Sequence, residues 1–209
     1  MNRFMKTATF FVALILSFSI CTAFAQAASS DTEAEAIRIL KDLGVADLSQ
    51  SEEPITRGEF AKILVNMMGR KDIAPSDTIF CDVKRDEKNS GYIQAAADEK
   101  ILSGYSDGYF RPFDSVTYYQ ALKPLVNMTG YERYATVKGG FPMGYSIVAN
   151  NVGILRGAGG IHGNEPITQG KLAVILKNTL TVSMLEFDSV TNGDIGYTNT
   201  SGKTLLKDK

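Results

Sequence analysis

One short pattern occurs three times along the chain and constrains its fold more than any other feature. Each occurrence is a β-branched residue and a threonine followed by apolar residues at helical spacing: Ile55-Thr56, Val116-Thr117 and Ile167-Thr168. A threonine before such a run is a favourable N-cap, and a Glu or Gln three positions later completes a capping box. Glu59 and Gln120 supply that residue in the first two copies, whereas Lys171 replaces it in the third. The sequence therefore predicts three equivalent amphipathic helices, the third with an incomplete cap.

A second, less similar helical segment precedes each of these three. In each of these segments the apolar residues lie on one helix face. The segment then ends at a glycine or a lysine, which one or two apolar residues follow. Residues 91–102 align with residues 144–155 without a gap. One such helix pair buries too little apolar surface alone, so the copies must share a core. We predict an all-α bundle of three helix–loop–helix units at residues 31–73, 78–131 and 134–185.

The first residues predict an export signal. Arg3 and Lys6 precede an uncharged apolar run at residues 8–24, and small residues suited to cleavage follow. The alternative is a membrane anchor, but the run is short for a span of ~20 residues and has no flanking stop-transfer charges. We expect residues 1–27 to be a cleaved signal peptide, which makes the mature protein secreted and leaves it without a membrane segment.

The mature chain is weakly acidic and has one cysteine. Removal of Arg3 and Lys6 takes the formal charge from −1 to −3, which argues against a nucleic-acid partner. Cys81 is the cysteine that remains, so an internal disulfide is excluded and stability must come from packing. Between Phe80 and Asp82, Cys81 is interpreted as a small buried residue.

The loop of the second copy has a distinctive composition. Residues 103–112, Ser-Gly-Tyr-Ser-Asp-Gly-Tyr-Phe-Arg-Pro, combine glycines, an Asp-Gly turn and three aromatic rings. Such rings can stack on sugar faces, while neighbouring polar groups bind hydroxyls and carboxylates. The alternative is that the rings fill the core beneath the loop. We favour the core position for Phe110, and both interpretations stay open for Tyr105 and Tyr109.

Four segments resemble the S-layer homology (SLH) repeat. They are Phe80-Cys81-Asp82-Val83, Tyr92-Ile93 with Ala95-Ala96, Ile101 to Pro112, and the helix start Ile55-Thr56-Arg57-Gly58-Glu59. The last resembles the family's Ile-Thr-Arg-Ala-Glu and differs from it at Gly58. The resemblance extends over roughly residues 31–185. It is strong in the second copy's loop and the first copy's helix start, and weak in the third copy.

The resemblance implies a pseudo-threefold bundle whose grooves between repeats bind a secondary cell-wall polysaccharide, often through a pyruvylated sugar. It thus implies a noncovalent anchor that holds an exported protein at the bacterial cell wall or S-layer. By resemblance, Arg57 would bind an acidic group of the glycan, which suits the forked donors of a guanidinium. The residues that would line or shape the groove with it are Asp82, Gly104, Tyr105, Asp107, Gly108 and Tyr109.

The copies depart from the family in different ways. The arginine position is Tyr118 in the second copy and Gln169 in the third, and the chain has no tryptophan. The third copy's loop, residues 156–163, lacks both the tyrosine and the Asp-Gly pair. At most one groove is therefore expected to keep the charged contact. The alternative role for Arg57 is that of a surface arginine.

Two other functions stay open. Repeats that have lost glycan binding would serve protein assembly at the envelope, and a wall-active hydrolase is the less favoured alternative. The one histidine, His162, lies in a glycine-rich loop, and no nearby residue marks an activated serine or cysteine. Metal ligation needs more clustered donors than the chain offers. We expect a binding protein without catalytic residues, metal or cofactor.

The last residues carry no helical pattern. Residues 186–209 are polar and contain turn signals such as Asn192-Gly193. We predict a disordered end or the start of a linker toward a cargo domain that is not present in this chain.

Overall fold

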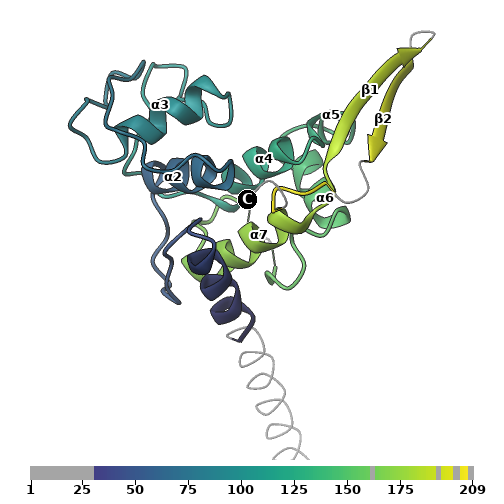
Figure 1. The fold of residues 1–209 in the computed structure, drawn as a ribbon, viewed down its shortest axis with the longest axis horizontal. Helices are drawn as coiled ribbons and strands as arrows, with labels where there is room; N and C mark the ends of the chain where they lie inside the picture. Colours follow the sequence, from purple (N-terminus) through teal and green to yellow (C-terminus); the bar gives the residue numbers. More distant parts are fainter. Residues whose placement is uncertain (1–30, 161–162, 192–193, 200–202, 207–209) are drawn as a thin grey trace, which may run out of the picture.

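The computed structural model describes residues 31–160, 163–191, 194–199 and 203–206. Its helices are residues 31–42, α2 (Arg57–Met67), α3 (Ser90–Asp98), α4 (Tyr118–Met128), α5 (Glu132–Val137), α6 (Met143–Asn151) and α7 (Gln169–Thr181) (Figure 1). The predicted all-α class is confirmed for this bundle. The predicted signal peptide lies outside the described residues. Within the part that is described, no helix is long and apolar enough to cross a membrane.

The three predicted helix starts are the N-termini of α2, α4 and α7. The hydroxyls of Thr56 and Thr117 each accept from the backbone N–H three residues later at 3.3 Å. The side chains of Glu59 and Gln120 accept in return from the threonine N–H groups, at 3.3 and 3.1 Å. Both predicted capping boxes are therefore formed. Thr168 has the same extended cap conformation but no side-chain cap bond, as expected where the third position is a lysine.

The ungapped alignment of the second and third copies is confirmed in the helix boundaries. α3 and α6 are each nine residues long, and each has a glycine, Gly91 or Gly144, as its second residue. A Cβ on Gly91 would overlap the carbonyl oxygen of Ala74, and a Cβ on Gly144 would overlap that of Ala135. In both copies the chain that precedes the helix passes so close that only glycine fits.

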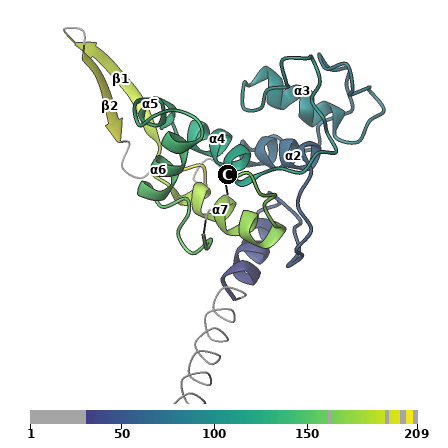
Figure 2. The same cartoon turned by 180° about the vertical axis from the view of Figure 1, so that it is seen from behind.

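The three helix starts meet near the centre of the molecule. They pair through isolated antiparallel bridges, Pro54 with Thr168, Thr56 with Ser115, and Thr117 with Pro166. The Val116 N–H donates to the Ile55 carbonyl at 3.0 Å, and the Ile167 N–H donates to the Val116 carbonyl at 2.9 Å. All three of these apolar side chains are at most 3% exposed. Each start thus contacts the other two, and α2, α4 and α7 converge on this point (Figures 1 and 2). The threefold symmetry of the whole bundle stays a prediction.

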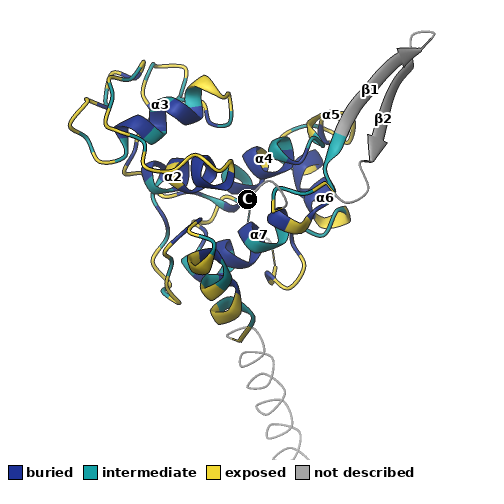
Figure 3. Cartoon of the chain, in the orientation of Figure 1, coloured by how far each residue is buried: buried dark blue, intermediate teal, exposed yellow. Residues whose placement is uncertain are grey.

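The second helix of one copy packs on the first helix of the next, α2 on α3 and α4 on α6. The buried residues line the inward faces of the helices (Figure 3). In the first and third copies, an asparagine ten positions after the threonine that precedes the second helix links the two helices. Asn66 Nδ2 donates to the Val45 carbonyl at 2.9 Å, and Asn178 Nδ2 donates to the Ile154 carbonyl at 3.0 Å. Val45 and Ile154 both follow the positive-φ glycine that ends the first helix.

The end of the chain differs from the expected disordered tail or linker. β1 (Leu185–Thr191) and β2 (Asp194–Asn199) form an antiparallel hairpin that extends away from the helices (Figure 1). The Leu185 N–H donates to the Thr129 carbonyl at 3.0 Å, which ties the base of the hairpin to the end of α4. A two-stranded hairpin is marginal alone, so this contact matters for its stability. The hairpin was not predicted, because the turn-forming residues of this segment indicated an irregular end more strongly than its short strands indicated a sheet.

The three threonine caps predict unequal costs of substitution. Thr56→Ala and Thr117→Ala should each lower the free energy of unfolding by about 1 kcal/mol, because each removes an acceptor for a helix N–H. Thr168→Ala should cost clearly less, since its side chain makes no cap bond. Urea unfolding followed by circular dichroism measures the three values, and equal losses at all three positions would contradict the assigned caps.

Candidate functional site

Arg57, the first residue of α2, clamps the loop of the second copy. Its Nε donates to the Phe110 carbonyl at 2.9 Å, and an Nη donates to the Ser103 carbonyl at 3.1 Å. The side chain is 7% exposed, so the alternative of a surface arginine is wrong. Burial lowers the pKa of the guanidinium, which nevertheless stays charged because an arginine titrates far above neutral pH. One residue of the first copy thus holds both ends of the loop at residues 103–110.

Aromatic rings surround this guanidinium. Its carbon lies 4.7 Å from the ring centroid of Phe110 and 4.9 Å from that of Tyr105, distances at which a cation is attracted to a ring. Phe110 is fully buried and packs on Phe80 with centroids 5.1 Å apart, which confirms its predicted core position. Arg111 approaches the same Tyr105 ring at 4.2 Å. Tyr105 therefore lies against two cations.

The Asp82 side chain shapes the loop by binding the loop's backbone N–H groups. Its two carboxylate oxygens accept from the N–H groups of Phe110 and Arg111 at 2.8 and 2.7 Å. Arg111 has a φ of 60°, in the left-handed region that non-glycine residues seldom adopt. The paired bonds from Asp82 hold this strained turn, so the predicted groove residue has a structural role here.

The loop's outer side carries an ion pair. Arg111 donates to Asp107 at 2.7 Å, and Asp107 also accepts from the Tyr109 N–H at 3.0 Å. The hydrogen bond from the Tyr109 N–H lowers the pKa of the Asp107 carboxyl most, and the ion pair with Arg111 lowers it further. The Tyr109 side chain is 46% exposed. Sequence reasoning missed Arg111, although its place four residues after Asp107 was a usable signal.

Two glycines make the loop possible. A Cβ on Gly104 would lie 2.5 Å from the Phe80 ring and 2.8 Å from the Tyr109 carbonyl oxygen, so a larger residue would displace the loop. Gly108 has a φ of 84° and donates its N–H to the Tyr105 carbonyl at 3.1 Å. Five of the predicted site residues therefore lie on one loop, and Arg57 and Asp82 hold that loop through its backbone. Their predicted contact with a ligand stays a prediction.

Cys81 differs from its predicted buried position. Its side chain is an exposed free thiol, while its N–H donates to the Gly108 carbonyl at 3.1 Å. The backbone is thus paired to the loop, and neighbouring Phe80 takes the buried position.

The positions equivalent to Arg57 also contact the loop region of another copy. Tyr118 is 2% exposed and its N–H donates to the Glu165 carbonyl at 3.1 Å. Burial, chiefly, raises the pKa of its phenol to about 12. In the third copy, Gln169 Oε1 accepts from the N–H and the hydroxyl of Ser49, both at 3.1 Å. The first residue of each second helix thus links two copies.

A pocket of about 430 Å³ lies beside α2, away from the predicted loop residues. Apolar residues from α2 and from the stretch between the first helix and α2 line it, together with polar residues from four separate segments: Val45, Ala46, Leu48, Ile55, Ile63, Lys41, Asp47, Glu59, Lys62, Lys88, Asn89 and Gln169. None of the seven predicted site residues is among them. These segments are far apart in the sequence and meet only where the copies pack together. The pocket therefore could not be predicted from any local stretch of sequence.

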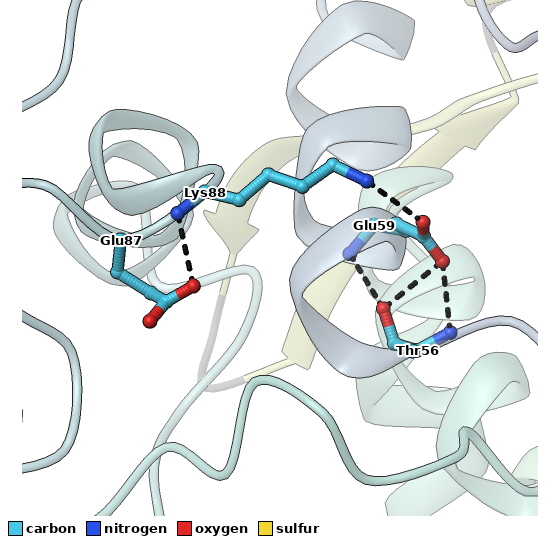
Figure 4. Close-up of polar contacts among 4 residues, drawn as sticks. All are labelled: Thr56, Glu59, Glu87 and Lys88. Atoms are coloured by element: carbon cyan, nitrogen blue, oxygen red, sulfur yellow. Dashed lines mark hydrogen bonds and ion pairs between the residues drawn. The ribbon is translucent and has the colours of Figure 1, made fainter.

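The charges of this pocket are unequal. Lys41 pairs with Asp47 at 2.9 Å, and Lys88 reaches across from the start of the second copy to pair with Glu59 at 3.2 Å (Figure 4). Lys62 has no ion pair among the described residues, and its ammonium lies 5.5 Å from the Tyr92 ring centroid. Three lysines thus face two carboxylates, and Lys62 is the cation in excess. The pocket can accept an anionic group over an apolar surface.

Residues 80–122 match the family model of the S-layer homology domain. This part of the chain is thus similar to an S-layer homology domain. The match includes the loop that Arg57 clamps, α3 and the first half of α4.

Two curated relatives agree with this match. The chain is 29% identical over 178 residues to a surface layer protein of Brevibacillus choshinensis, which covers 82% of the chain and 15% of that protein. It is 31% identical over 138 residues to the middle cell wall protein of Brevibacillus brevis, which covers 65% of the chain and 13% of that protein. The chain thus corresponds to a small part of each relative.

The Arg57 clamp predicts a large loss of stability. Arg57→Ala removes the donors to two loop carbonyls and should lower the free energy of unfolding by about 2–3 kcal/mol. The matched control is Arg70→Ala, which removes a half-exposed ion pair with Glu99 and should cost less than about 0.5 kcal/mol. Chemical denaturation of both variants makes the comparison, and similar small losses would contradict the clamp.

Proposed function

We propose that this protein is a noncovalent cell-wall anchor that binds an anionic wall polysaccharide. Its match to the S-layer homology domain and its two relatives indicate a secreted, cell-wall-associated protein. We propose a binding protein and not an enzyme, since both relatives are surface or cell-wall proteins by name. Within the described residues, no three His, Cys, Asp or Glu side chains are placed to hold a metal ion.

The observation that carries the proposal is the pocket beside α2. Its excess lysine and its apolar surface suit a sugar that bears a carboxylate, such as a pyruvylated sugar. Gln169 uses only its carbonyl oxygen to bind Ser49, so its amide N–H groups are left out of those bonds and can serve hydroxyls. The partly exposed loop of the second copy, with Tyr109 and Arg111, is the second contact surface that we propose.

Arg57 has a changed role in this proposal. Two of its five N–H donors are already bound to loop carbonyls, and its side chain is almost fully buried. We therefore propose that Arg57 mainly positions the loop for the ligand. The exposed Arg111 then supplies the accessible charge on this surface.

Sedimentation with cell-wall sacculi tests the anchor. The mature protein should sediment with intact sacculi of Brevibacillus brevis and stay in the supernatant after extraction of the secondary polysaccharide. Equal sedimentation with extracted walls would contradict polysaccharide binding. Sedimentation that is lost only after protease treatment of the walls would favour the alternative of an envelope assembly module.

A charge variant tests the pocket. Lys62→Gln removes the excess cation and should weaken binding to the released polysaccharide about tenfold, with a smaller loss at high salt because screening already weakens the contact. Lys138→Gln, an exposed change at the end of α5 outside the pocket, is the matched control and should bind like the unchanged chain. Unchanged affinity of Lys62→Gln in isothermal titration calorimetry would contradict the pocket as the site.

A further inference from the structure

Exposed apolar side chains gather at one corner of the molecule. Of the ten large apolar side chains that are exposed among the described residues, five lie in α5, in α6 and in the loop that joins them. We call this stretch, residues 134–147, the α5–α6 corner, and it lies on the other side of the molecule from α3 (Figures 1 and 2). Such a cluster marks a contact with a partner or a membrane. Its five exposed members are Tyr134, Val137, Phe141, Met143 and Ile147.

The fold does not require apolar residues at this corner. The helix boundaries align residues 137–143 with residues 84–90, because α6 begins at Met143 and α3 begins at Ser90. The earlier segment reads Lys-Arg-Asp-Glu-Lys-Asn-Ser, and the later one reads Val-Lys-Gly-Gly-Phe-Pro-Met. One copy thus has charged and polar residues where the other exposes apolar ones, although both helices are nine residues long. The exposed apolar residues therefore serve a purpose other than the packing of the chain.

The corner is held at its base and open at its tip. The Gly140 N–H donates to the Ala135 carbonyl at 2.9 Å, which closes the turn after α5. The Phe141 ring rests edge-on against buried Tyr145, with centroids 6.2 Å apart. A Cβ on Gly139 would meet nothing within 4 Å, so no described part of the chain covers the turn. A preformed, projecting turn loses little conformational entropy on binding.

Cations flank the apolar side chains of the corner. Lys138 lies between α5 and the turn glycines, and Arg133 lies in the first turn of α5. Lys123 of α4 lies 5.9 Å from the ring centroid of Phe141. All three cations are exposed, and none forms an ion pair within the described part of the chain. Glu132 is the one acidic residue between residues 131 and 147, so this surface is locally cationic on an acidic chain.

We propose that the α5–α6 corner is a peripheral membrane contact, which inserts Val137, Phe141 and Met143 between lipid headgroups while the flanking cations bind anionic headgroups. A bilayer has an apolar interior directly beneath a charged layer, and the corner complements that arrangement. A second copy of the chain fits less well, since two such corners face to face would bring like charges together. A protein partner would need a hollow shaped to the projecting turn, whereas a bilayer accepts the turn whatever its shape. The corner shares no residue with the pocket beside α2.

Sedimentation with lipid vesicles tests this contact, using the mature chain without the predicted signal peptide. The chain should bind vesicles of equal parts phosphatidylglycerol and phosphatidylcholine, and should bind phosphatidylcholine vesicles at least about tenfold more weakly, because the cations lose their partners. Val137→Ser combined with Met143→Ser should weaken binding to the mixed vesicles by more than about tenfold. The matched control is Ile79→Ser combined with Phe113→Ser, which removes two side chains that are each 70% exposed elsewhere, and it should bind like the unchanged chain. Thermal unfolding checks that each variant keeps the fold.

A fluorescence measurement tests insertion directly. The chain has no tryptophan, so Val137→Trp introduces a single reporter at the corner. Its emission should shift to shorter wavelength when the mixed vesicles are added, because the indole moves from water into apolar surroundings. Phe113→Trp places the reporter at an exposed position outside the corner and should show no shift.

Three outcomes would overturn the inference. The first is that the unchanged chain does not bind the mixed vesicles, and the second is that the Val137 and Met143 double variant binds them equally well. The third is an unshifted Val137→Trp emission on vesicle-bound chain. A dimer in sedimentation velocity that the double variant converts to a monomer, without vesicle binding, would assign the corner to a second copy. The double variant should bind the released wall polysaccharide like the unchanged chain, so failure of the membrane contact is distinguishable from failure of the proposed anchor.

Discussion

Backbone hydrogen bonds between the three helix starts determine the positions of the other elements. Each start is a short extended segment, and a strand-like pair needs its partner's N–H and carbonyl groups in register. Because Val116 both donates to Ile55 and accepts from Ile167, a shift of one segment would break bonds to the other two. The second helices begin directly after these segments, so their directions follow from the junction. The first helices then pack against the apolar faces of the second helices, as α3 does against α2 and α6 against α4.

This junction explains why the residue after each capping threonine is important. The first helical residue lies where one copy meets the loop region of another, whatever its chemical type. At this contact, the first copy has the guanidinium of Arg57, the second has the buried ring of Tyr118, and the third has the amide of Gln169. The copies can thus diverge at this position without losing the fold, because backbone bonds and not these side chains define the junction. Divergence at this position therefore changes the chemistry of a contact between copies and leaves the backbone junction in place.

Features that depend on local sequence could be predicted, and features that depend on distant segments could not. The capping boxes of α2 and α4 and the core position of Phe110 follow from neighbouring residues, and the structure confirms them. The seven site residues were predicted from a motif, which indicates proximity but not exposure. The motif therefore could not distinguish the buried Arg57 from the accessible Arg111. The pocket needs Lys41, Lys88 and Gln169 from three segments, so only the fold reveals it.

A repeated scaffold can carry different side chains at equivalent contacts between its copies. Few local elements recur between copies: a threonine before each second helix, a glycine at the start of the first helix in the second and third copies, and a helix-linking asparagine in the first and third. The positions around them, where consecutive copies meet (α2 with α3, and α4 with α6), carry no such structural requirement. Lys88 can therefore be replaced by Phe141 at the equivalent place while α3 and α6 keep the same length. Under the proposed function, the pocket beside α2 and the loop of the second copy would act at high effective concentration toward a single polysaccharide chain. Weak individual subsites are then compatible with firm retention on a polymeric wall.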